Sequence, residues 1–145
     1  MKPLVSILIP AYNAEMWLTD TLQSALAQTW ENKEIVIVDD GSKDGTLALA
    51  RTFESEIVKV YTHKNSGASA TRNKAYSLCH GDYIQWLDAD DLLAPTRLRS
   101  RWKRWVIRPI QRYCSLASGA ASCIGPRGPS LFRPGCGAIC PKQNG

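Results

Sequence analysis

Three aspartates, Asp88, Asp90 and Asp91, stand close together directly after a short apolar run. That run, residues 83–87, has the composition of a buried strand, so it would hold the three carboxylates on a rigid support. Carboxylates this close repel one another, and a positive charge must offset them. Mg²⁺ and Mn²⁺ are hard cations that commonly bridge one or two carboxylates to a diphosphate. We therefore predict a divalent-metal site here; the alternative is a set of solvated loop acids.

A second acidic pair, Asp39 and Asp40, ends another apolar run and leads into turn residues 41–45. A carboxylate at a strand end can accept hydrogen bonds from a nucleobase or from ribose hydroxyls. The competing interpretation is that Asp40 or Ser42 caps the helix that follows, and both roles can coexist. Residues 41–45 match neither the dinucleotide-binding glycine pattern nor a P-loop, which disfavours dehydrogenases and ATPases.

Arg72 is the cationic side chain best placed to serve these acids, because it falls in the first turns of a predicted helix over residues 68–79. An arginine there can reach a phosphate or brace the carboxylates, although a plain surface arginine has the same sequence signature. His63 and His80 lie far apart and have no cysteine at ligand spacing, so the sequence does not favour a zinc site.

The elements that must position these residues alternate along the first ninety-odd positions. We expect strands at residues 4–9, 34–39, 57–61 and 83–87, separated by three helices. The first helix carries its apolar residues at one-face spacing and Asn13 as its cap; Ser42 or Asp44 would cap the second, and Gly81 would end the third. This order predicts an α/β fold with a mostly parallel sheet, whose ligands bind outside the carboxyl ends of the strands.

Charge divides the chain at Asp91. The formal net charge is +5, but all 13 acids lie up to Asp91, together with eight bases, and residues 92–145 hold ten bases and no acid. We weigh three interpretations of the later part: a basic amphipathic helix over residues 97–108 on an anionic membrane, a nucleic-acid-binding segment, or out-of-frame or disordered sequence. Lost apolar periodicity and missing acids favour the third, and we expect no nucleic-acid partner.

The start of the chain lacks the pattern of a cleaved signal peptide, and no apolar run approaches the length of a membrane helix. Five cysteines, an odd number, argue against a secreted disulfide framework. We therefore expect a cytoplasmic protein, either free or associated with the inner face of the membrane.

Four segments together resemble glycosyltransferase family 2. They are VSILIPAYN at residues 5–13, VDDGSKDGT at 38–46, GASATRN at 67–73 and LDADD at 87–91. They follow the family's order and intervals over residues 3–98. The resemblance implies that residues 1–96 are the nucleotide-sugar-binding half of a Rossmann-like GT-A fold, truncated here. From their composition we expect residues 97–145 to form an irregular basic tail rich in Cys, Arg, Gly and Pro.

The resemblance also implies an inverting, metal-dependent transfer of a sugar from a nucleoside-diphosphate donor to an acceptor hydroxyl, on a glycan or a lipid-linked sugar, as in polysaccharide biosynthesis. The metal would be Mn²⁺ or Mg²⁺. The resemblance implies that the nucleoside is bordered by Pro10, Ala11 and Tyr12, and that the base is bound by Asp40 together with Asp39. It also implies that Arg72 lies near the base or the phosphates, that Asp88 and Asp90 bind the metal, and that Asp88 approaches the ribose.

One departure from the family concerns catalysis. The family's general base is an Asp or Glu from the acceptor-binding half, after the metal motif, whereas this sequence has no Asp, Glu or His after Asp91. We therefore assign no catalytic residue and expect weak or absent transfer by the truncated chain. The alternative is a non-catalytic nucleotide-sugar-binding or membrane-associated module. A nucleotidyltransferase is less favoured, because residues 10–13 are not its glycine-rich loop.

Overall fold

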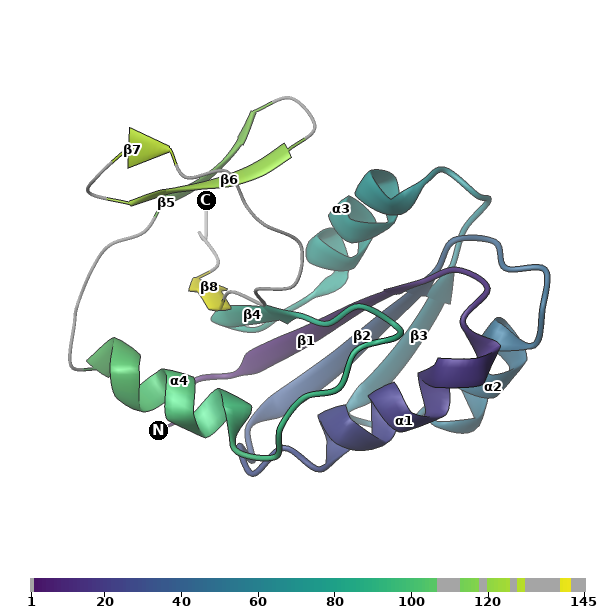
Figure 1. Cartoon of the computed structure of the whole chain (residues 1–145), viewed down its shortest axis with the longest axis horizontal. Coiled ribbons are helices and arrows are strands. Elements are labelled where there is room, and N and C mark those ends of the chain that lie inside the picture. Colours follow the sequence, from purple (N-terminus) through teal and green to yellow (C-terminus); the bar gives the residue numbers. More distant parts are fainter. Residues whose placement is uncertain (1, 107–112, 118–119, 126–127, 130–138, 142–145) are drawn as a thin grey trace.

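The computed structural model describes residues 2–106, 113–117, 120–125, 128–129 and 139–141, with side chains through Trp102 (Figure 1). Its main sheet has the order β3-β2-β1-β4-β8. The first four of these strands are mutually parallel, as predicted, and the fifth pairs antiparallel with β4. The strands of this sheet are β1 (Val5–Ala11), β2 (Lys33–Asp39), β3 (Val58–Thr62), β4 (Tyr83–Trp86) and β8 (Ile139–Pro141).

Helices cover both faces of this sheet, which confirms the α/β prediction (Figure 1). On one face lie α1 (Glu15–Leu26), α2 (Thr46–Thr52) and α4 (Arg97–Val106), and on the other lies α3 (Ala68–Leu78). We expected an irregular tail, whereas the structure describes short strands there. Strands β5 (Tyr113–Ala117), β6 (Ala120–Gly125) and β7 (Gly128–Pro129) form an antiparallel sheet. Strand β8 pairs with β4. Backbone pairing at an open edge needs no apolar periodicity.

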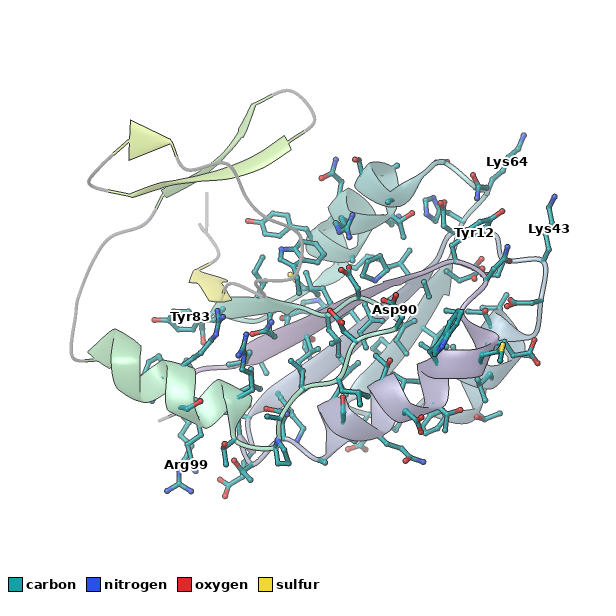
Figure 2. All side chains as sticks on the ribbon, in the orientation of Figure 1. Tyr12, Lys43, Lys64, Tyr83, Asp90 and Arg99 are labelled. Atoms are coloured by element: carbon teal, nitrogen blue, oxygen red, sulfur yellow. The ribbon has the colours of Figure 1, made fainter. Side chains whose placement is uncertain are left out.

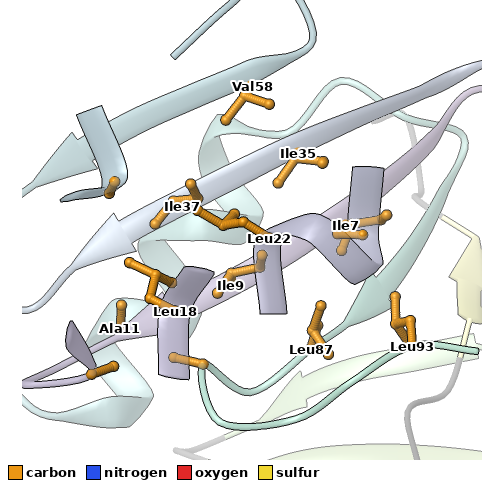
Figure 3. Close-up of a cluster of buried hydrophobic side chains, with 14 of the residues drawn as sticks. Ile7, Ile9, Ala11, Leu18, Leu22, Ile35, Ile37, Val58, Leu87 and Leu93 are labelled. Atoms are coloured by element: carbon orange, nitrogen blue, oxygen red, sulfur yellow. The ribbon is translucent and has the colours of Figure 1, made fainter. Parts of the chain in front are cut away.

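Strand alternation divides the core into two clusters. Ile7, Ile9 and Ile37 point toward α1, where they meet Leu18 and Leu22, and all five side chains are buried (Figure 3). Because successive strand residues point to opposite faces, the intervening residues of β1 and β2 pack against α3 instead. Both faces of the central strands are therefore apolar, as parallel sheets require.

Helix α4 packs against the first of these clusters. Leu98 is buried, and the Trp102 ring lies 5.5 Å from the rings of both Trp30 and Tyr83. The apolar side of the predicted membrane-bound helix comprises Leu98, Trp102, Trp105 and Val106, and the first two of these contact the protein core. The side chains of the other two, Trp105 and Val106, lie outside the described residues. None of the helices in the described part of the chain has the length and apolar character that crossing a membrane requires.

Two predicted caps are wrong. Helix α1 begins after Ala14, and the Asn13 side chain does not cap it; its Oδ1 accepts a hydrogen bond from the Lys43 N–H (2.9 Å). Helix α3 ends at Leu78 rather than at a glycine cap. Gly81 serves a close approach instead, because a Cβ there would lie 2.4 Å from Oγ and 2.7 Å from N of Ser6.

That close approach belongs to a polar cluster at the amino ends of the strands. Oε1 of Glu34 accepts hydrogen bonds from the Ser6 hydroxyl (2.5 Å) and from the N–H groups of His80 (2.5 Å) and Gly81 (3.1 Å). Burial alone would raise the pKa of Glu34, but these hydrogen bonds to its charged form outweigh burial and lower the pKa. The cluster ties the turn between α3 and β4 to β1 and β2.

A carboxylate with a lowered pKa stabilises the folded state above its ordinary pKa, and this stabilisation is lost as the pH falls through the lowered value. Glu34→Gln should therefore reduce the free energy of unfolding at pH 7 by about 1–3 kcal/mol. The difference from wild type should shrink below the ordinary glutamate pKa of 4.5. Urea denaturation at a series of pH values measures this; a difference that stays constant down to pH 3 would contradict it.

Candidate functional site

The predicted site residues gather where β1, β2 and β4 end. Figure 2 shows Tyr12, Lys43 and Lys64 beyond the ends of the strands and Asp90 on the connection that follows β4. Pro10 and Ala11 are the last residues of β1, and Ala11 lies beside Asp39 in the parallel register. Ala11 is buried, whereas the Tyr12 side chain is exposed.

The loops after β1 and β2 are bonded to each other. The Asn13 N–H donates to the Ser42 hydroxyl (2.9 Å), and the Ala14 N–H donates to the Thr46 hydroxyl (2.8 Å). Asp44 accepts hydrogen bonds from the hydroxyl and the N–H of Thr46, the first residue of α2, and the hydroxyl contact lowers the Asp44 pKa most. Of the three caps proposed for this helix, Asp44 is therefore the one that binds its first turn.

Asp39 closes the turn after β2. Its side chain accepts hydrogen bonds from the N–H groups of Gly41 (3.2 Å) and Ser42 (3.3 Å) and from the Thr62 hydroxyl (3.0 Å). The residue is buried, with 1% of its surface exposed. These contacts join the ends of β2 and β3 and leave Asp39 turned into the protein.

Asp40 holds the loop that precedes α3. Its Oδ1 accepts the Ser66 N–H (2.7 Å), and its Oδ2 accepts the Gly67 N–H (3.0 Å). The loops meet so closely that a Cβ at Gly41, whose φ is +67°, would lie 2.8 Å from Asn65 N. The prediction that Asp40 or Ser42 caps the next helix is thus wrong, because Asp40 binds the loop before α3 and the Ser42 hydroxyl accepts the Asn13 N–H.

Arg72 and Asp88 join α3 to the loop after β4. An Arg72 Nη donates to Asp88 Oδ1 at 2.8 Å, and both side chains are 43% exposed. This is the bracing contact that the sequence indicated. The Asp91 N–H bonds back to the Asp88 carbonyl (3.0 Å), which turns the chain there. Asp90 is exposed and makes no hydrogen bond or ion pair with any described residue.

Three polar side chains, two on α1 and one just after its C-terminal end, hold the loop after β4 in place. We did not identify these residues from the sequence. The Thr21 hydroxyl donates to the Ala89 carbonyl (2.8 Å), and the Ser24 hydroxyl accepts the Leu93 N–H (3.0 Å). Gln28 donates to the Ala94 carbonyl (2.8 Å) and accepts the Leu98 N–H (3.2 Å). They follow one another at intervals of three and four residues, next to the apolar face of α1, and this sequence pattern could have identified them.

The described residues contain no group of three or more His, Cys, Asp or Glu side chains arranged to hold a metal ion. Mg²⁺ and Mn²⁺ do not require one, since such ions keep several waters and take one or two carboxylates together with substrate phosphates. Asp88 and Asp90, which is exposed and has no partner among the described residues, lie on one turn and fit that smaller set of ligands.

Comparison with known proteins identifies the family. The model of glycosyl transferase family 2 matches residues 6–109, and the chain belongs to that family. TuaG of Bacillus subtilis, a putative teichuronic acid biosynthesis glycosyltransferase, is 44% identical over 93 residues, covering 62% of this chain and 37% of its own. S. aureus TarS 1-349, solved with UDP-GlcNAc, superimposes with a TM-score of 0.69 at 27% identity, over 74% of this chain and 32% of its own.

An uncharacterized glycosyltransferase of Rickettsia felis is 36% identical over 132 residues, covering 89% of this chain and 21% of the relative. An alignment of that length includes residues beyond position 96. The chain spans about a third of the length of the first relatives that it matches, 30% of one and 37% of another. The GT-A-like fold predicted from the sequence is confirmed by these likenesses.

The hydrogen bond from Thr21 to the Ala89 carbonyl is buried, and removing its donor should destabilise the protein. Thr21→Val keeps the shape but leaves that carbonyl unpaired, so the free energy of unfolding should fall by about 1–3 kcal/mol. Thr19→Val is the matched control, since Thr19 is half-buried on the same helix and hydrogen-bonds to no described residue through its hydroxyl. Urea denaturation measures both; equal effects of the two variants would contradict the assignment.

Proposed function

We propose that this chain binds a nucleoside-diphosphate sugar at the carboxyl ends of β1, β2 and β4, as the donor-binding half of an inverting, metal-dependent glycosyltransferase. The observation that carries the proposal is the Arg72–Asp88 pair with Asp90, which pairs with no described residue, on the same turn, at the sheet edge that also carries Asp40. Membership of the family and the likeness to TarS, which was solved with UDP-GlcNAc, support it.

The nucleoside would lie against residues 10–12 and the loop after β2. Tyr12 offers an exposed aromatic ring, while buried Ala11 can offer its backbone alone. Asp40 would accept a hydrogen bond from the base, because an ionised carboxylate is an acceptor and uracil and guanine carry ring N–H donors. Asp39 is committed to its turn, so its part would be to hold Asp40 in place.

The diphosphate would lie between Arg72 and the turn at residues 88–91. Arg72 is a fixed cation that can contact phosphate oxygens, and its pairing with Asp88 sets its direction. Asp88 and Asp90 would hold Mn²⁺ or Mg²⁺, which when bound supplies Lewis-acid stabilisation of a departing nucleoside diphosphate. The bonds from α1 to residues 89–98 would keep both carboxylates on a fixed support.

Transfer itself requires an acceptor hydroxyl to lose its proton as it attacks the anomeric carbon. The absence of Asp, Glu and His after Asp91 leaves no conventional base in that part of the chain. We therefore propose that this chain alone transfers sugar weakly or not at all. TuaG is named for teichuronic acid biosynthesis, which is consistent with a glycan acceptor. We propose a glycan or a lipid-linked sugar as the acceptor, and a location in the cytoplasm or at the inner face of the membrane.

Donor binding can be tested by calorimetry with UDP and GDP, in the presence and absence of Mn²⁺. We expect one of the two nucleotides to bind more tightly when Mn²⁺ is present. Asp90→Asn should weaken the Mn²⁺-dependent binding at least about tenfold, because it removes an anionic metal ligand. Far-UV circular dichroism checks that the variant folds.

Asp20→Asn provides the matched control, because Asp20 is an exposed aspartate on α1 without a hydrogen-bond partner among the described residues. It should bind like the wild type. Wild-type protein that binds neither nucleotide would overturn the proposal, and Asp90→Asn with unchanged affinity would overturn the metal assignment.

The alternative function is a non-catalytic nucleotide-sugar-binding or membrane-associated module. The charge of residues 92–145 favours it, since ten bases without an acid would be attracted to an anionic surface. With UDP-GlcNAc as the donor and a glycan acceptor, we expect no transfer above the buffer control by mass spectrometry. Measurable transfer by the purified chain would exclude the non-catalytic alternative.

The division at residue 96 and the out-of-frame origin of residues 97–145 stay hypotheses. Helix α4 packs on the core through Leu98, and the alignment with the Rickettsia felis relative extends beyond residue 96; both observations count against an out-of-frame origin. Sequencing the coding DNA decides the matter. A second reading frame near Thr96 that continues with family-like acceptor-domain sequence would support the out-of-frame origin, and its absence would end it.

A further inference from the structure

His63 is a histidine of the candidate site to which we have so far assigned no role. It follows β3 directly, and its side chain, 22% exposed, lies between the loop after β2 and the first turn of α3. Its Nε2 is 3.3 Å from Asp40 Oδ1 and 3.1 Å from Thr71 Oγ1. The Asp40 side chain is 6% exposed, so the contact is shielded from water.

Hydrogen-bond accounting fixes which nitrogen of His63 carries a proton. The Thr71 hydroxyl has one hydrogen, which it donates to the Gly67 carbonyl (3.0 Å), because a carbonyl cannot donate. Thr71 Oγ1 must then accept from His63, and the Asp40 carboxylate can also only accept. His63 therefore carries a proton on Nε2 and donates it to Thr71 Oγ1, while Asp40 Oδ1 lies 3.3 Å from the same nitrogen.

The position of His63 is fixed from the backbone as well. Its N–H donates to the Asp39 carbonyl (3.1 Å), which extends the pairing of β2 and β3 by one residue. The side chain therefore reaches Asp40 and Thr71 from a rigid support. Thr71 is followed by Arg72, whose partner is Asp88. His63 thus contacts Asp40 at one end of the proposed donor site and hydrogen-bonds to the residue that precedes Arg72 at the other.

We propose that His63 is a positioning residue for nucleobase recognition, which orients the Asp40 carboxylate toward a base that offers a ring N–H. The inference rests on the proposed function and deepens it. Ser66 and Gly67 donate to Asp40 from a loop, whereas His63 contacts it from the end of a strand. Loss of the His63 ring beside it would let the carboxylate turn with the loop, and recognition of the base would weaken while contact with the diphosphate persists.

The test measures the affinities for UDP, CDP and inorganic pyrophosphate, each with Mn²⁺. The ring nitrogen N3 is a donor in uracil but an acceptor in cytosine, and pyrophosphate has no base. We expect His63→Ala to bind UDP about tenfold more weakly, to discriminate less between UDP and CDP, and to bind pyrophosphate like wild type. His63→Gln, whose amide N–H can replace Nε2–H, should restore most of the UDP affinity.

His80→Ala is the matched control, because His80 lies at the opposite edge of the sheet with a side chain that is 78% exposed. It should leave all three affinities unchanged. An equal loss of UDP and pyrophosphate binding in His63→Ala, or no rescue by folded His63→Gln, would show that the role of His63 is purely structural. Wild-type protein that binds no nucleotide would instead refute the proposed function.

A second measurement is independent of any ligand. Nitrogen-15 NMR of the wild type should show His63 protonated at Nε2, with the signal identified by its loss in His63→Gln. A proton on Nδ1 alone would overturn the proposal even if nucleotides bind.

Discussion

Carboxylates that accept hydrogen bonds from backbone N–H groups close the loops at the functional edge of this sheet. Parallel strands end there together, and the irregular chain that follows them has N–H donors without partners in the sheet. Asp39 takes those of the turn after β2, Asp40 takes those of the loop before α3, and Asp44 takes those at the start of α2. The acidic motif must satisfy these donors before it can bind anything else.

This constraint separates the acids by role. Asp39 and Asp40 are buried and bonded to the backbone, so their positions are determined by the fold. Asp88 and Asp90 stand on an exposed turn, where Asp88 has one cationic partner and Asp90 has none among the described residues. Carboxylates that accept backbone hydrogen bonds have fixed positions, and carboxylates without such bonds attract a cation. Both kinds at one edge give a site that is preorganised and still able to bind charge.

The sequence was sufficient for the strands and for the faces of the helices. Residues such as Ile7 and Leu18 reveal their burial by spacing, and the parallel order follows from the alternation of strands and helices. The sequence was insufficient wherever a polar side chain hydrogen-bonds to a residue far away along the chain. Asn13 looks like a local cap but binds the loop after β2, and Thr21 looks like a surface residue of α1 but holds a loop 68 positions away. Such partners depend on the assembled tertiary structure.

Helix α1 is attached at both ends to parts of the site. Near its start the Ala14 N–H bonds to Thr46, and two turns later Thr21 bonds to the Ala89 carbonyl. A helix turns by about 100° for each residue, so one inserted or deleted residue between these attachments would swing the Thr21 hydroxyl away from its acceptor. The first turns of α1 therefore have a fixed length, and variation in chain length within this half of the fold must be confined to other segments.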